Sequence, residues 1–168
     1  MEKKETILGI DPGFGRMGFG IIEKNGSDWQ AVAYGCLETS AKKSFVDRLA
    51  ELHEEMIRLI KIYKPTRVAV EKLFFFKNVK TATDVGQARG VILLSAVECN
   101  LPVDEFTPLQ IKQAITGFGR AEKDQIQKMV AMILGLKCKI KSDDAADALA
   151  IALTAGQSLW MNRLKQKK

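Results

Sequence analysis

Four acidic residues stand where apolar segments of the chain begin or end. Asp11 closes the run TILGID and Glu71 closes RVAVE, while Asp144 and Asp147 open SDDAADALAIAL. The last two are three apart, so a helix would place them on one face. Carboxylates without histidine or thiolate partners form an all-oxygen set, which suits hard cations such as Mg²⁺ or Mn²⁺. Two such ions about 4 Å apart can activate a water and stabilise the leaving oxygen of a phosphodiester.

Each acid also has a simpler interpretation. Asp11 could start a turn, Glu71 could be a solvated strand end, and Asp143 and Asp144 could complement the positive end of a helix dipole. Asp147 fits such an account least, because its neighbours are Ala, Leu and Ile around the whole helix and predict burial. A buried carboxylate needs a cation or several donors, so either a salt bridge or a metal could accompany it.

Composition removes several other kinds of chemistry. The 168 residues suit one domain with its own core, and 46% of them are hydrophobic. A single histidine, His53, argues against a histidine zinc site or a histidine-activated nucleophile, and we expect it on an exposed helix surface. The net charge of +6 favours a polyanionic partner such as nucleic acid. Cys36, Cys99 and Cys138 are scattered without a CxxC pair, which suits reduced thiols.

The sequence also predicts where the protein works. The first residues, MEKKET, are charged and lack the apolar core of a signal peptide, and no apolar run reaches membrane-spanning length. We therefore expect a cytoplasmic protein with no membrane partner. It should form a single domain over 1–168, with a core at about 6–157 and a basic tail at 158–168, of which RLKQKK is expected to be frayed.

Apolar spacing predicts an α/β chain with a five-stranded mixed sheet flanked by helices. The expected strands are 6–10, 18–24, 29–38, 67–71 and 103–106. The expected helices are 44–63, 81–99, 109–115, 122–134 and one from 142 toward 160. Asn25-Gly26 predicts a hairpin, so the first three strands should form an antiparallel meander and the later ones should pair in parallel.

The stretch GFGRMG, Gly13–Gly18, matches the GxGxxG pattern of dinucleotide-binding proteins, and Glu38 lies twenty residues further on. That pattern requires a helix after the glycines, whereas the following residues are typical of a strand. We therefore interpret the stretch as a tight connection between antiparallel strands. Ile7, Gly9 and Asp11 alternate onto one face, and we expect Gly9 to leave open space beside the acid.

Five stretches together resemble the RuvC family of bacterial Holliday junction resolvases, over about residues 7–153. They are LGIDPG, VEKLFFFKN, GQARG, TPLQIKQAITGFGRAEKDQIQKMV and DDAADALAIAL, in that order. The resemblance implies a ribonuclease H-like fold with an acidic quartet at Asp11, Glu71, Asp144 and Asp147. The DAAD spacing leaves Asp143 as an extra acid, which could serve only the helix N-terminus.

The resemblance also implies how such an enzyme works. Family members are homodimers that resolve a four-way junction by paired symmetric nicks, in recombination and repair. They use Mg²⁺, with two ions per site and Mn²⁺ as a substitute. They act with a branch-migration helicase complex of the RuvA-RuvB type. The region Val79–Asn100 is small and apolar enough for helix packing, either in a dimer or in the core.

Several residues are candidates for DNA contact. The resemblance implies Phe74 at the junction centre with Phe75 and Lys77 beside it, and phosphate contacts at Lys112 and Lys123. The basic residue Arg120 could also neutralise a phosphate. The three consecutive phenylalanines after Glu71 could stack on bases, but at least one could equally anchor the loop in the core.

Three other functions remain open from the residues alone. An actin-like or sugar-kinase ATPase would share the fold but needs two such domains. A DNA-binding module without catalysis would not need the quartet. A ribonuclease H-type nuclease would share the acids and differ in its substrate.

Overall fold

One mixed sheet and the helices on its two faces make up the part of the chain that the computed structural model describes, residues 4–72 and 79–166. The strands are β1 (Thr6–Asp11), β2 (Arg16–Asn25), β3 (Asp28–Glu38), β4 (Arg67–Glu71) and β5 (Val103–Phe106). The helices are α1 (Phe45–Tyr63), α2 (Val79–Glu98), α3 (Pro108–Thr116), α4 (Lys123–Ile133) and α5 (Asp143–Gln166).

The sheet has the order β3-β2-β1-β4-β5. β1, β2 and β3 form the antiparallel meander, and Gly26 takes a positive φ of 61° in the hairpin between β2 and β3. β4 pairs in parallel with β1, and β5 in parallel with β4. The five-stranded mixed sheet expected from the sequence is thereby confirmed.

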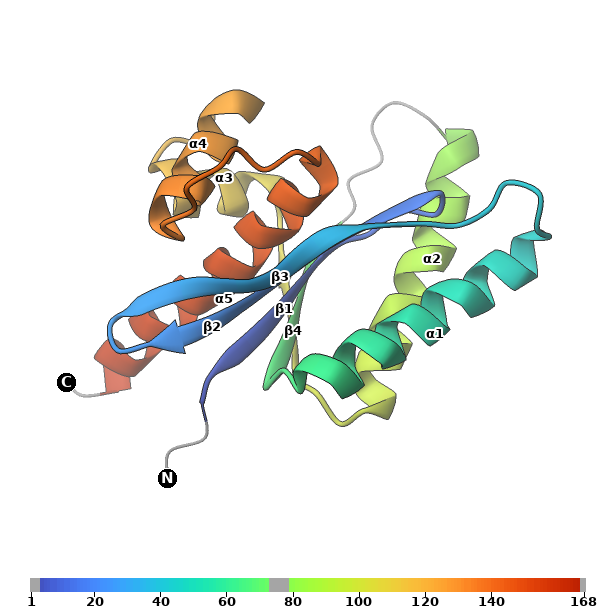
Figure 1. Cartoon of the computed structure of the whole chain (residues 1–168), viewed down its shortest axis with the longest axis horizontal. Helices are drawn as coiled ribbons and strands as arrows, with labels where there is room; N and C mark the ends of the chain where they lie inside the picture. Colours follow the sequence, from blue (N-terminus) through green and yellow to red (C-terminus); the bar gives the residue numbers. More distant parts are fainter. Residues whose placement is uncertain (1–3, 73–78, 167–168) are drawn as a thin grey trace.

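Alternation along the strands divides the core into two layers. Leu8, Ile10 and Val68 pack with α1 and α2 on one face of the sheet. Ile7 and Ala69 point to the other face, where α5 lies on the sheet and α3 and α4 cover α5 (Figure 1). Odd-numbered residues of β1 and β4, which include both strand-end acids, therefore face α5.

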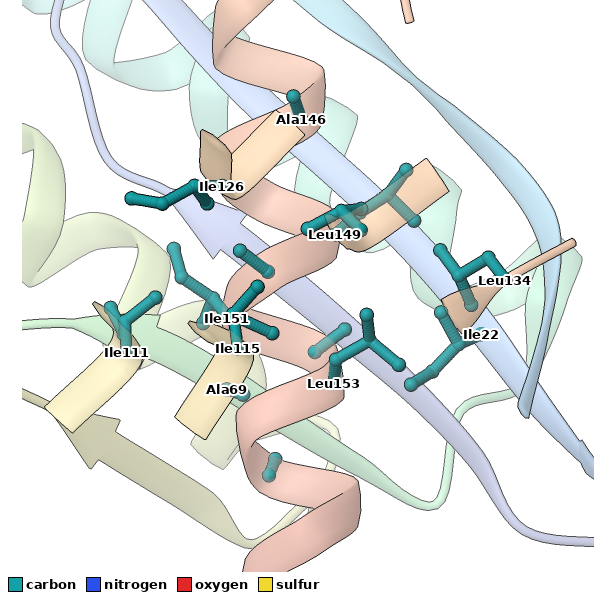
Figure 2. Packing of buried hydrophobic residues seen from close by; sticks show 14 of the residues in the cluster. Ile22, Ala69, Ile111, Ile115, Ile126, Leu134, Ala146, Leu149, Ile151 and Leu153 are labelled. Carbon is teal, nitrogen blue, oxygen red and sulfur yellow. The ribbon is translucent and has the colours of Figure 1, made fainter. Parts of the chain in front are cut away.

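α5 is buried from Ala145 to Gly156, apart from the half-buried Asp147. Figure 2 shows Leu149, Ile151 and Leu153 of this helix among side chains of α3, α4 and the sheet. All three are at most 1% exposed. Burying a Leu or Ile side chain contributes about 1.5–3 kcal/mol, so packing fixes α5 firmly on the sheet. The buried helix predicted from DAADALAIAL is thus a core helix in the structure.

Glycines on the strands let α5 come close. A Cβ on Gly9 would lie 2.2 Å from the carbonyl oxygen of Ala148, and one on Gly20 would lie 2.7 Å from the amide nitrogen of Leu149. The expectation that Gly9 leaves open space is therefore wrong, because the backbone of α5 fills that space. The glycine is needed for contact between helix and strand.

Replacing Gly9 by alanine should destabilise the fold, since the added methyl meets backbone atoms that cannot rotate away. We expect a loss of about 1–3 kcal/mol or more in the free energy of unfolding, measured by urea denaturation. Gly15→Ala is the matched control, because the nearest atom to its Cβ is the Arg48 side chain at 3.5 Å. Equal stabilities for the two variants would contradict this close packing.

α5 is longer than the sequence predicts. It continues to Gln166, and in its last turn Arg163 forms an ion pair of 3.0 Å with Glu5. The tail RLKQKK, which the sequence predicts to be frayed, is therefore helical up to Gln166. Even so, none of the helices in the described ranges is both long and apolar enough to cross a membrane.

His53 also differs from its expected place. Its Nδ1 lies 2.9 Å from Oγ of the buried Ser95 on α2, and the histidine is half-buried. It therefore connects α1 to α2, where a purely exposed position was expected. The sequence could not show this, because the partner lies 42 residues away.

Candidate active site

The two strand-end acids lie side by side. β1 and β4 are parallel neighbours with Ile10 opposite Val70, so the next residues along the two strands are Asp11 and Glu71. Neighbouring strands are about 4.8 Å apart, which brings these two side chains close together. Both face α5. The sheet thus supplies half of the predicted acidic quartet, at the carboxyl ends of two neighbouring inner strands.

The first turn of α5 supplies the other half. Gly18 pairs with Asp11 across β1 and β2, and a Cβ on Gly18 would lie 2.1 Å from the carbonyl oxygen of Asp144. The missing side chain lets the helix start directly over the strand ends. Ser142 Oγ accepts a hydrogen bond of 3.3 Å from the amide of Ala145, which fixes this start. The structure therefore brings together all four acids that the sequence singled out.

Burial, together with repulsion between carboxylates, raises the pKa values of Asp11, Glu71 and Asp147. Burial, and then the nearby carboxylates in the order Glu71, Asp147, Asp144, together raise the pKa of Asp11 to about 8. Burial and then Asp147 raise the pKa of Glu71 to about 7. Burial also raises the pKa of Asp147, although Lys123 acts in the opposite direction. The site holds more negative charge than it can stabilise alone, so it favours protons or cations.

Two lysines border this acidic centre. Lys123 Nζ lies 3.4 Å from Asp147 Oδ2. Burial acts to lower the pKa of Lys123, but the carboxylates of Asp147 and Asp143 together act more strongly in the other direction, so the pKa is raised. The positive charge of Lys112 acts to lower the pKa of Glu71. A cavity of about 230 Å³ opens between these groups. Its walls are Glu71, Pro108, Ile111, Lys112, Lys123, Ile126, Asp147, Ala150 and Ile151. The cavity is therefore lined by acidic, basic and apolar side chains.

Asp147 is less buried than its sequence neighbours predict. Its side chain is 36% exposed, because it points from α5 toward the cavity, whereas Ala146 and Ala148 on either side are fully buried. The carboxylate is thus anchored by a buried helix yet open to a ligand.

Two partners of Asp144 were not predicted. Arg16 Nε lies 3.0 Å from Asp144 Oδ2, and Cys36 Sγ donates a hydrogen bond of 3.4 Å to the same oxygen. Arg16 is also 3.5 Å from Glu38. The signal was in GFGRMG, since Arg16 stands two residues before Gly18 on β2, so both face the start of α5. Only the three-dimensional packing connects it to Asp144.

Arg89 of the GQARG stretch supports Glu71 through the backbone. Its Nε donates a hydrogen bond of 3.1 Å to the carbonyl oxygen of Glu71, and its guanidinium pairs with Glu105 on β5. α2 is thereby tied to the ends of β4 and β5. From the sequence, this stretch was part of the family resemblance and of a packing surface, with no contact to Glu71 predicted.

The donor set suits a hard cation. The four acids offer only carboxylate oxygens, which Mg²⁺ and Mn²⁺ prefer. Within residues 4–72 and 79–166, no three His, Cys, Asp or Glu side chains are gathered closely enough to enclose a metal ion. The four acids therefore border the same space, but no three of them are close enough together to surround a single ion. The raised pKa of Asp11 is the observation that fits a cation here, because a nearby positive charge would stabilise the ionised carboxylate and lower its pKa.

The structure places some of the predicted DNA contacts near this centre. Lys112 and Lys123 line the cavity, and Arg120 is exposed in the connection between α3 and α4. Phe74, Phe75 and Lys77 lie outside the described residues. Asp143, taken from the sequence as an extra acid, contacts both Lys123 and Gln127.

Comparison with known proteins connects this site to one family. The family model "Crossover junction endodeoxyribonuclease RuvC" matches residues 7–155. The chain is 51% identical to the RuvC of Halothermothrix orenii, over 94% of this chain and 96% of that protein. It is 53% identical to the RuvC of Petrotoga mobilis, over 90% and 93%. The structure of Thermus thermophilus RuvC in complex with a Holliday junction substrate superposes with a TM-score of 0.89 at 34% identity, covering 94% of this chain and 96% of that one.

The family model's match, residues 7–155, includes all four acids, β2 to β5, α1 to α4 and the first half of α5. The ribonuclease H-like fold implied by the sequence is confirmed, and so is the enzyme class, a hydrolase of DNA. On this evidence the chain belongs to the RuvC family of crossover junction endodeoxyribonucleases.

Proposed function

We propose that this chain resolves four-way DNA junctions by hydrolysing phosphodiesters with two divalent cations held by its four clustered carboxylates. Mg²⁺ is the proposed metal, with Mn²⁺ able to substitute. The observation that carries the proposal is the meeting of Asp11, Glu71, Asp144 and Asp147, with the pKa of Asp11 raised to about 8 by burial and by the other acids. The relative from T. thermophilus, solved with a Holliday junction, supports the choice of substrate.

The residues of the chain divide the work. Bound cations would polarise the phosphate and activate the attacking water. The carboxylates hold the cations, and the buried part of α5 keeps Asp144 and Asp147 rigid. Lys112 and Lys123 stand at the cavity to neutralise phosphate charge. The apolar wall that includes Ile151 limits water, which strengthens each of these electrostatic contacts.

A substrate panel with Mg²⁺ tests this proposal. We expect cutting of a four-way junction at symmetric positions, little cutting of a linear duplex of the same sequence, and none of an RNA–DNA hybrid. Preferred cutting of the hybrid would support a ribonuclease H-type enzyme instead. Binding of the junction without any metal-dependent cutting would leave only a binding module.

Lys112→Ala should weaken junction binding and flatten its salt dependence. Each lost phosphate contact lowers the slope of log K against log salt by about 0.9. Binding is measured without divalent metal, so that cleavage does not interfere. Lys61→Ala, on α1 at the opposite face of the sheet, is the control and should keep the wild-type slope. An unchanged slope in Lys112→Ala would show that this lysine does not touch the backbone.

A second copy of the chain would supply the second cut. The described part of each chain forms one acidic centre, and a two-fold dimer places two of them in matching geometry. Leu94 and Val97 lie three apart on α2 and are 56% and 61% exposed, which supports Val79–Asn100 as the contact region. The resemblance also supports a partnership with a branch-migration helicase complex.

Sedimentation should give a dimer, and Leu94→Glu with Val97→Glu should give monomers if this surface is the contact.

A further inference from the structure

Lys123 has two carboxylate partners, and only one of them belongs to the acidic quartet. Its Nζ lies 3.4 Å from Asp147 Oδ2 and 3.2 Å from Asp143 Oδ2. Asp143 is the first residue of α5, and Lys123 is the first residue of α4. The lysine therefore connects the starts of two helices directly at the cavity.

Asp143 is itself held in place. Gln127 Nε2 donates a hydrogen bond of 2.7 Å to Asp143 Oδ1, the oxygen that Lys123 does not use. Gln127 is only 5% exposed, and it lies four residues after Lys123, so both point from the same face of α4. A nearly buried amide must satisfy its donors, which orients it strongly. Both oxygens of Asp143 thus have a defined partner on α4.

This arrangement matters because a lysine side chain is long and mobile. Holding it in one geometry costs rotamer entropy, which two fixed acceptors offset better than one. Asp147 cannot serve Lys123 and a metal ion equally well with the same oxygen. Asp143 has no place in the proposed metal site, so it can keep the ammonium at the cavity while Asp147 binds the cation.

We infer that Asp143 is a positioning residue, which together with Gln127 holds the Lys123 ammonium beside the phosphate to be cut. This inference rests on the proposed function and adds a role for an acid that the sequence assigned only to the helix N-terminus. A helix-dipole role would need no partner on α4, whereas the observed contacts use both carboxylate oxygens on that helix.

A double-mutant cycle tests the inference, with single-turnover cleavage of a four-way junction at saturating Mg²⁺ as its measurement. Asp143→Ala should slow cleavage about tenfold, equivalent to about 1.4 kcal/mol in the barrier, with little change in junction affinity. In a Lys123→Ala background the same substitution should have no further effect, because residues that act through one another are not additive. Asp143→Asn, which can still accept from Gln127, should be as slow as Asp143→Ala.

Asp124→Ala is the matched control. It removes an exposed acid from the first turn of α4, outside the contacts between Lys123 and Asp143. It should cleave at the wild-type rate. Thermal melting of each variant accompanies the rates, and a purely structural role for Asp143 would lower the melting temperature and leave the rate of the folded enzyme unchanged.

Three results would overturn the inference. Asp143→Ala could slow cleavage equally with and without Lys123, could match the Asp124→Ala control, or Lys123→Ala could cleave at the wild-type rate. In each case the wild-type enzyme still cuts the junction with Mg²⁺. Failure of the proposed function looks different, since the wild type would then not cut the junction at all.

Discussion

Asp147→Asn is expected to bind the four-way junction as the wild type does and to cut it at least about a thousandfold more slowly with Mg²⁺, which is about 4 kcal/mol in the barrier. Asparagine keeps the shape of the side chain but removes the charge that holds a cation. The helix should be unaffected, because the neighbours Ala146 and Ala148 carry the packing at this point. Binding by gel shift without metal and cleavage with metal measure the two effects separately.

The control for this variant is Asp124→Asn, an exposed acid on α4. It should cut at the wild-type rate. If Asp147→Asn also cuts at that rate with Mg²⁺, Asp147 is not part of the metal site. A loss of folding in Asp147→Asn, seen by circular dichroism, would instead indicate that its contact with Lys123 is structural.

Asp11→Asn should make the metal-free protein more stable at about pH 8. The pKa of Asp11 is raised from 3.8 to about 8, so between these values the folded protein holds a proton that the unfolded chain releases. Stability from this group is full at low pH and falls as pH rises toward 8. Asparagine removes this loss. Since one pKa unit corresponds to about 1.4 kcal/mol, we expect the variant to gain at least about 1 kcal/mol at about pH 8.

Urea unfolding in EDTA measures this effect across pH. The advantage of Asp11→Asn should shrink as pH falls toward 3.8 and disappear well below that value, where Asp11 is protonated in both the folded and the unfolded wild type. Excess Mg²⁺ should reverse the order, because a ligand that binds only the folded state stabilises it. Asp28→Asn, in the exposed hairpin, should stay within about 0.5 kcal/mol of the wild type throughout. A wild type more stable than Asp11→Asn in EDTA at about pH 8 would contradict the crowding of carboxylates.

Local pattern was enough to predict the sheet and the acidic centre. Alternation in TILGID and RVAVE fixes which face each strand-end acid takes, and parallel pairing then places Asp11 beside Glu71. The three-residue spacing of Asp144 and Asp147 fixes their common face on α5. These inferences need only the periods of strands and helices and the order of elements.

Contacts between distant segments could not be predicted in this way. Arg16 and Cys36 reach Asp144 only because Gly18 lets α5 lie against β2. The role of Gly9 was misjudged for the same reason, since the depth of α5 above the sheet is a property of the whole packing. Asp143 looked like a residue for the helix dipole because its partner Gln127 lies 16 residues earlier on another helix.

The most direct test of the central claim is a Mn²⁺ titration, followed by electron paramagnetic resonance, of the protein bound to an uncut junction analogue. The account predicts two bound ions per wild-type chain, the same number for the Asp124→Asn control, and a clear loss of both affinity and number for Asp11→Asn combined with Asp147→Asn. Wild-type Mn²⁺ binding by that double variant, with junction affinity retained, would show that the four carboxylates do not hold the metal.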